Sequence, residues 1–109
     1  MSAKEILVAA RELLSDPDHW TKLVLAKTVN NEPKEPTDPE AVCWCSIGAL
    51  YKVTGISVSL PDSSATIVYA AQRKLEEALG NDLGIDEFND CSEHKEVLEL
   101  FDKAIQNAS

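Results

Sequence analysis

The feature that most constrains this fold is the spacing of apolar residues, which recur every three or four positions in several separate segments. That spacing places them on one face of a helix. Residues 3–14 show it first, with Ser2 as a helix cap and Glu5 where a capping-box carboxylate reaches back to the cap. Pro17 and the residues just before it end the segment. The apolar stripe comprises Ile6, Leu7, Ala10, Leu13 and Leu14.

Two later segments have the same period. Residues 64–79 are predicted to form a helix that Gly80 closes. A final helix is capped by Ser92 and runs to about Asn107.

Residues 40–54 are predicted to form the central helix. Asp38 and Pro39 provide a cap followed by proline, and Gly55 supplies the residue after the helix end. Apolar side chains spread round nearly the whole cylinder, so neighbouring elements should enclose it. Gly48 would let another helix approach this backbone closely.

Residues 20–29 fit two interpretations. The pair Asp16 and Pro17 can begin a helix that places Trp20 and Leu23 on one face. The β-branched residues between 21 and 29 also fit a strand. Of the two, we favour the helix.

The remaining segments connect these helices. Residues 30–38 contain two prolines and form a surface loop, residues 56–60 alternate like a short strand or an extended connector, and residues 80–91 form an acidic loop. The predicted fold class is all-α, a small four- to five-helix orthogonal bundle with one or two short extended segments. Residues 1–109 are expected to make a single helical domain.

Charge is distributed unevenly along the chain. Lys and Arg number 10 against 19 Asp and Glu, a net charge of −9, and residues 62–109 hold 11 acidic and 4 basic residues. An acidic surface repels phosphate backbones, so we expect no direct nucleic-acid binding. It favours an unknown protein partner of basic character, or a second copy of the chain in a homodimer.

The sequence shows no sign of a membrane span or an export signal. No apolar run approaches the roughly 20 residues that cross a bilayer, and residues 1–5 lack the apolar stretch of a secretory signal. Three cysteines, an odd number, fit a reducing compartment. We therefore expect a cytoplasmic protein without membrane association.

Cysteine and histidine supply the candidate reactive groups. Cys43, Cys45, Cys91 and His94 offer four zinc ligands, but helical residues 43 and 45 would point about 200° apart, so no metal site is predicted. Cys45 or Cys43 could instead act as a nucleophile with His94 as the base, and Asn89 or Asp90 would orient the imidazole. Thiols are activated at the N-terminus of a helix, where backbone N–H groups lower their pKa. In a helix beginning at residue 40, Cys45 would lie about two turns beyond that position, which argues against its activation. No catalytic residue and no cofactor is assigned, and these side chains stay as candidates only.

Trp44, Trp20 and Tyr51 are the candidate binding residues. Large aromatic side chains often anchor partners at interfaces. In a chain with two Trp, two Tyr and two Phe, the same residues also serve as core.

Four segments together resemble a known family over most of the chain. They are residues 9–14 with the His-Trp pair at 19–20, the segment 41–50 with Trp-Cys-x-x-Gly-Ala-Leu at 44–50, Phe-Asn-Asp at 88–90, and Glu-Val-Leu at 96–98. The family that they resemble is DUF6197, small uncharacterised bacterial and phage proteins. Phe88 stands where the family has Trp. The resemblance implies a compact helical domain of prokaryotic or phage origin and brings no activity or ligand.

The predicted function is that of a small non-enzymatic module for protein interaction or ligand binding, whose acidic surface meets a basic partner or itself. One alternative is a thiol-dependent hydrolase or transferase using Cys45 or Cys43 with His94. Another is a phage-type inhibitor that mimics DNA with its carboxylates.

Overall fold

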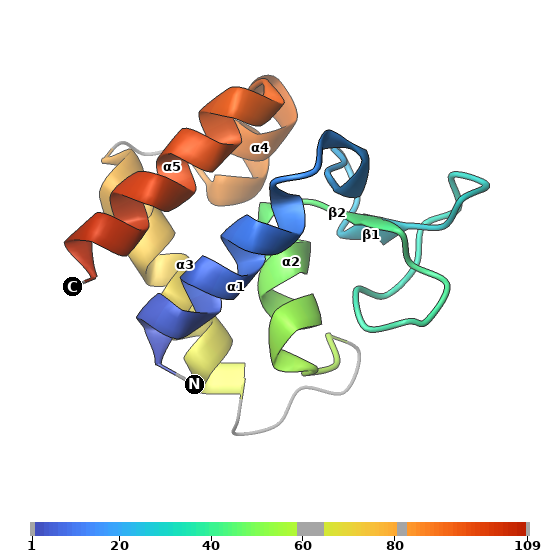
Figure 1. The fold of residues 1–109 in the computed structure, drawn as a ribbon, viewed down its shortest axis with the longest axis horizontal. Helices are drawn as coiled ribbons and strands as arrows, with labels where there is room; N and C mark the ends of the chain where they lie inside the picture. Colours follow the sequence, from blue (N-terminus) through green and yellow to red (C-terminus); the bar gives the residue numbers. More distant parts are fainter. Residues whose placement is uncertain (1, 59–64, 81–82, 109) are drawn as a thin grey trace.

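Five α-helices and a small two-stranded sheet form the part of the chain that the computed structural model describes, residues 2–58, 65–80 and 83–108 (Figure 1). The mostly α-helical small bundle predicted from the sequence is confirmed. In chain order the elements are α1 (Ala3–Leu14), the 3-10 turn η1 (Pro17–His19), β1 (Ala26–Lys27), β2 (Cys43–Trp44), α2 (Ser46–Thr54), α3 (Thr66–Leu79), α4 (Ile85–Cys91) and α5 (His94–Asn107).

Helix α1 packs against α2, α3 and α5, and the sheet lies to one side of these helices (Figure 1). Both hydrogen bonds of the capping box between Ser2 and Glu5 are formed, as predicted. Phe101 of α5 is the largest fully buried side chain, and its burial stabilises the fold by about 1.5–3 kcal/mol. The residues α1 buries are Ile6, Leu7, Ala10 and Leu14.

Helix α2 is shorter than predicted. It begins at Ser46 because the preceding residues are extended, and Cys43–Trp44 pairs antiparallel with Ala26–Lys27. The Trp44 indole N–H donates to the Pro36 carbonyl oxygen at 2.9 Å. These contacts come from outside the 40–54 segment, and they stabilise the extended backbone over the helical alternative.

Residues 20–29 form no α-helix, so the favoured interpretation of this segment is wrong and the strand alternative is closer. Asp16 and Pro17 do begin a helical turn, but η1 ends at His19. Beyond it, the Thr21 N–H donates to the Trp44 carbonyl oxygen at 3.0 Å. The close approach expected at Gly48 is present, but the neighbour is the backbone of Leu25 and not another helix. A β-carbon at Gly48 would overlap the Leu25 carbonyl oxygen.

Helix α4 lies where an acidic loop was expected. Ile85 and Asn89, one turn apart, are both buried and fix its inner face. Two anchors in seven residues are too few to create a visible period. Helix α5 begins at His94 with Glu93, rather than Ser92, as its N-cap.

Parts of three predicted segments lie outside the described residues. They are residues 59–60 of the predicted connector 56–60, residue 64 of the predicted helix 64–79 and residues 81–82 of the predicted acidic loop 80–91. Residues 56–58 form no strand. Among the described helices, none has the length and apolar character needed to cross a membrane.

Candidate functional site

A buried amide, that of Asn89, joins three distant segments. Its Oδ1 accepts hydrogen bonds from the Trp20 indole N–H at 2.8 Å, the Ser46 backbone N–H at 3.0 Å and the Ser46 hydroxyl at 2.7 Å. Its Nδ2 donates to the Thr21 carbonyl oxygen at 3.0 Å. A fully buried amide is stable only when such partners are present. Asn89 therefore holds α4 against the start of α2 and against residues 20–21.

The neighbouring Asp90 shapes the 21–25 loop. One of its carboxylate oxygens accepts the Leu23 backbone N–H at 2.8 Å. Leu23 has a left-handed backbone, with φ of 74°, and its side chain is 81% exposed. A non-glycine residue in this conformation costs about 1–3 kcal/mol and persists where surrounding contacts impose it. The fold thus holds a leucine outward into solvent.

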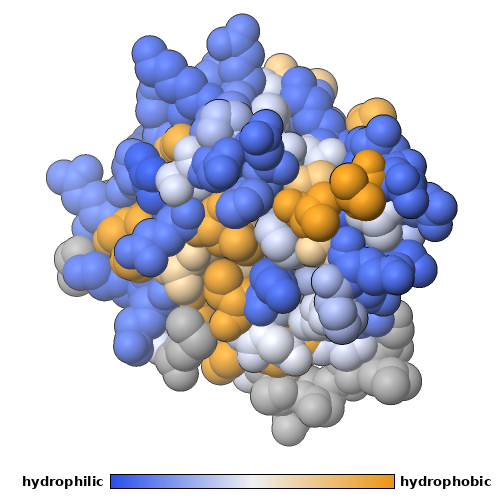
Figure 2. Space-filling model, turned by 45° about the vertical axis from the view of Figure 1, so that its right-hand side comes forward, coloured by the Kyte–Doolittle hydropathy of each residue, from blue (hydrophilic) through white to orange (hydrophobic). Residues whose placement is uncertain are grey.

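An open hollow of about 250 Å³ lies between this loop and α4. Its walls combine apolar surface from the loop with carboxylates from α4. Asp86 is exposed and Asp90 is half-buried, so both carboxylates border water. In Figure 2 the side of the molecule that carries the sheet comes forward, and apolar patches on it are separated by hydrophilic side chains. The lining residues of the hollow are Leu23, Val24, Leu25, Cys45, Asp86 and Asp90.

Cys45 is the N-cap of α2, which corrects its predicted place two turns inside a helix. Its Sγ accepts the Gly48 backbone N–H at 3.3 Å. The side chain is 5% exposed, and burial raises the pKa of the thiol in spite of the backbone N–H groups that favour the thiolate. A buried thiol with a raised pKa is a weak nucleophile at neutral pH.

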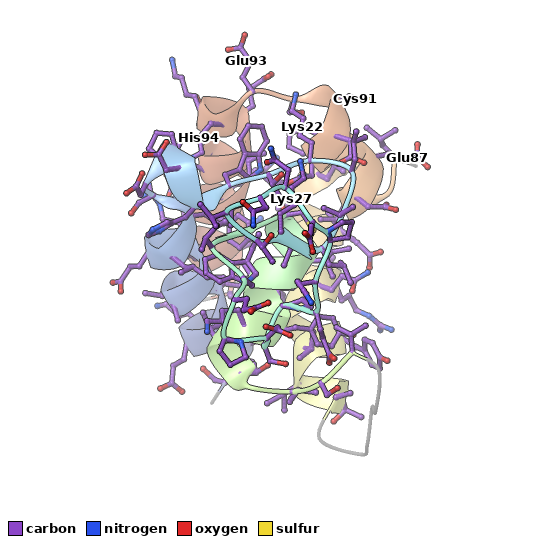
Figure 3. The ribbon with its side chains drawn as sticks, turned by 90° about the vertical axis from the view of Figure 1, so that its right-hand side faces the viewer. Lys22, Lys27, Glu87, Cys91, Glu93 and His94 are labelled. Carbon is purple, nitrogen blue, oxygen red and sulfur yellow. The ribbon has the colours of Figure 1, made fainter. Side chains whose placement is uncertain are left out.

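His94 does not line the hollow beside Cys45. Its Nε2 donates to the Leu14 carbonyl oxygen at 2.6 Å, and its ring lies 5.6 Å from the Trp20 ring. Cys43 lies in β2 and is half-buried. Figure 3 places Cys91 and His94 on different sides of the turn between α4 and α5. Within residues 2–58, 65–80 and 83–108, no three metal-ligating side chains gather.

The two segments that carry the family resemblance most specifically are the ones that Asn89 joins, since its hydrogen bonds to Ser46 tie 44–50 to 88–90. The model of the Family of unknown function (DUF6197) matches residues 1–107. The chain belongs to DUF6197. No curated protein and no solved structure matches it.

The candidate aromatic residues of this DUF6197 protein have internal contacts. Trp44 is 5% exposed, and the Lys52 ammonium lies 5.6 Å from its ring centre. Trp20 is half-buried, with the Lys22 ammonium 5.4 Å from its ring centre, and its indole N–H donates to Asn89. Tyr51 is 7% exposed, and burial is the main cause that raises the pKa of its hydroxyl. Their roles as binding residues stay predictions.

The hollow of this DUF6197 protein also has four lining residues that were not candidate site residues in the sequence, namely Leu23, Val24, Leu25 and Asp86. Nothing in the run 21–25 marks the left-handed backbone of Leu23, because glycine or asparagine normally occupies such positions. The Asn-Asp pair at 89–90 was the available signal, since it stood out both as a candidate orienting pair and in the family resemblance.

Proposed function

We propose that this DUF6197 protein is a non-enzymatic protein-interaction module that binds a basic partner in the hollow between the 21–25 loop and α4. The observation that carries the proposal is the exposure of the Leu23 side chain, which points into solvent. Asp90 holds Leu23 in a costly conformation that removes no apolar surface from water. Such an exposed apolar side chain beside carboxylates suits a partner that covers it.

Charge selects the class of partner. Among the described residues, Asp86, Glu87 and Asp90 take part in no ion pair, whereas Glu77, Glu99 and Asp102 are paired with cations. Glu87 points outward from α4 (Figure 3). A lysine or arginine of the partner would neutralise the α4 carboxylates while its aliphatic stem covers the apolar wall.

The test uses a synthetic peptide of alternating leucine and arginine, titrated into the isotope-labelled protein at low salt. We expect saturable amide shifts that are largest at residues 23–25 and 85–91. Leu23→Ser should weaken binding about tenfold, because one buried leucine contributes about 1.5–3 kcal/mol. Val29→Ser is the matched control, since Val29 is 80% exposed and outside the hollow.

Two results would contradict the proposal. One is equal affinity for the parent protein and the Leu23→Ser variant. The other is a control peptide, with glutamate in place of every arginine, that shifts the amides of residues 23–25 and 85–91 as strongly as the basic peptide does. Rising salt should also weaken the complex, since exposed charges are screened beyond about 8–10 Å at physiological ionic strength.

Fewer observations support the two alternative functions, the thiol-dependent reaction and the mimicry of DNA. The thiol-dependent reaction needs an imidazole beside Cys45 or Cys43, and the contacts of His94 lead instead to α1 and Trp20. DNA mimicry needs a continuous strip of carboxylates, and ion pairs with Lys74, Lys95 and Arg11 interrupt the acidic half. The three free cysteines suit a reducing compartment, so a cytoplasmic location is part of our proposal.

A further inference from the structure

The outer face of α3 carries a second hollow with the opposite charge. It has a volume of about 330 Å³, and its lining contains two cationic side chains and no carboxylate. That is unusual on a chain with a net charge of −9. The lining residues are Thr66, Tyr69, Ala70, Arg73 and Lys74.

Tyr69 is an exposed aromatic side chain at the edge of the core. It is 52% exposed, and it is among the groups that raise the pKa of the buried Tyr51 hydroxyl. A partner that covers this ring would remove its aromatic surface from water. Tyrosine is also among the residue types that contribute most at interfaces.

Arg73 lies one helical turn from Tyr69, so the two side chains are neighbours on the α3 surface. The ion pairs of the described residues engage Arg11 with Asp102 at 2.9 Å and Lys74 with Glu77 at 3.6 Å, but none engages Arg73. A guanidinium group binds a carboxylate through two parallel N–H donors. Arg73 therefore offers a site for an external carboxylate.

We infer that this face of α3 is a second interaction surface, which binds a short acidic segment of a protein partner. A glutamate or aspartate of that segment would pair with Arg73, and an apolar neighbour would cover Tyr69 and Ala70. The strongly negative chain repels a long polyanion, which favours a short acidic segment over a nucleic acid.

The test uses a synthetic peptide of alternating leucine and glutamate, titrated into the labelled protein at low salt. We expect amide shifts centred on residues 66–74. Arg73→Gln should weaken binding about tenfold or more, because a charge-assisted hydrogen bond is lost. Tyr69→Ala removes the exposed ring, and it should weaken binding several-fold.

Lys103→Gln is the matched control, because it removes an exposed cation from α5, away from the hollow. Binding that Arg73→Gln and Lys103→Gln weaken equally would overturn the inference, since only net charge would then matter. A dimer in sedimentation experiments that Arg73→Gln abolishes would also overturn it, because the occupant would be a second copy. Neither result depends on whether the α4 surface binds basic peptides.

Discussion

Replacing Asn89 with alanine should strongly destabilise the protein. The Asn89→Ala change removes the acceptor of three hydrogen bonds, from Trp20 and from two groups of Ser46, and the donor to the Thr21 carbonyl oxygen. Each bond contributes about 0.5–1.5 kcal/mol net, and leaving its buried partner unsatisfied costs more. Water entering the space and rotation of the Ser46 hydroxyl will recover part of this. We expect a loss of about 3–5 kcal/mol.

Urea denaturation followed by tryptophan fluorescence and by far-ultraviolet circular dichroism measures this loss. In thermal unfolding it corresponds to a decrease in Tm of about 4 °C for each kcal/mol. Asn107→Ala is the control, because Asn107 is exposed at the end of α5 and should change stability by less than about 0.5 kcal/mol.

A double-mutant cycle separates the network from simple loss of volume. Ser46→Ala and Asn89→Ala should show a coupling free energy of at least about 0.5 kcal/mol, because the two side chains share a hydrogen bond. The reasoning would be refuted if Asn89→Ala lowered the free energy of unfolding by less than about 1 kcal/mol.

Three further predictions concern α2 and the cysteines. Ala49→Asp should lower the free energy of unfolding by more than about 4 kcal/mol, because Ala49 is fully buried; a urea midpoint near that of the parent would show that the site tolerates charge. Gly48→Ala should destabilise by at least about 1 kcal/mol despite the better helix propensity, since its β-carbon would overlap the Leu25 carbonyl oxygen; a higher Tm would contradict this. Iodoacetamide at neutral pH, followed by mass spectrometry, should label exposed Cys91 first and Cys45 last, because burial raises the pKa of Cys45. Early labelling of Cys45 would instead support the thiol-dependent alternative. The raised pKa of Cys45 also stabilises the folded protein below pH 9.0, the ordinary pKa of a thiol, and this stabilisation is lost as the pH rises through the pKa of the folded state.

The sequence identified several residues of the candidate site but did not predict how they are arranged in space. Cys45, Asn89, Asp90 and His94 were all singled out from the sequence, yet the structure places the carboxylate of Asp90, not the imidazole of His94, on the hollow that Cys45 lines. Sequence spacing fixes which residues share an element, but it does not fix which elements meet.

Local sequence by itself determined the helices α1, α3 and α5. Their apolar stripes have the helical period over at least 12 residues, and their ends depend on near neighbours, such as the Ser2 cap of α1 and the left-handed Gly80 after α3. Helical hydrogen bonds connect residues four apart, so the information lies within the segment.

Only the tertiary structure decided where α2 begins, that residues 20–29 form a loop and the short strand β1 instead of a helix, and that residues 85–91 are helical. Each outcome depends on partners far along the chain: β1 pairs with β2, Pro36 accepts from Trp44, and Asn89 bonds to Trp20 and Ser46. In such short segments, the local propensities for helix and strand differ by less than these distant contacts supply. The distant partners therefore set the conformation.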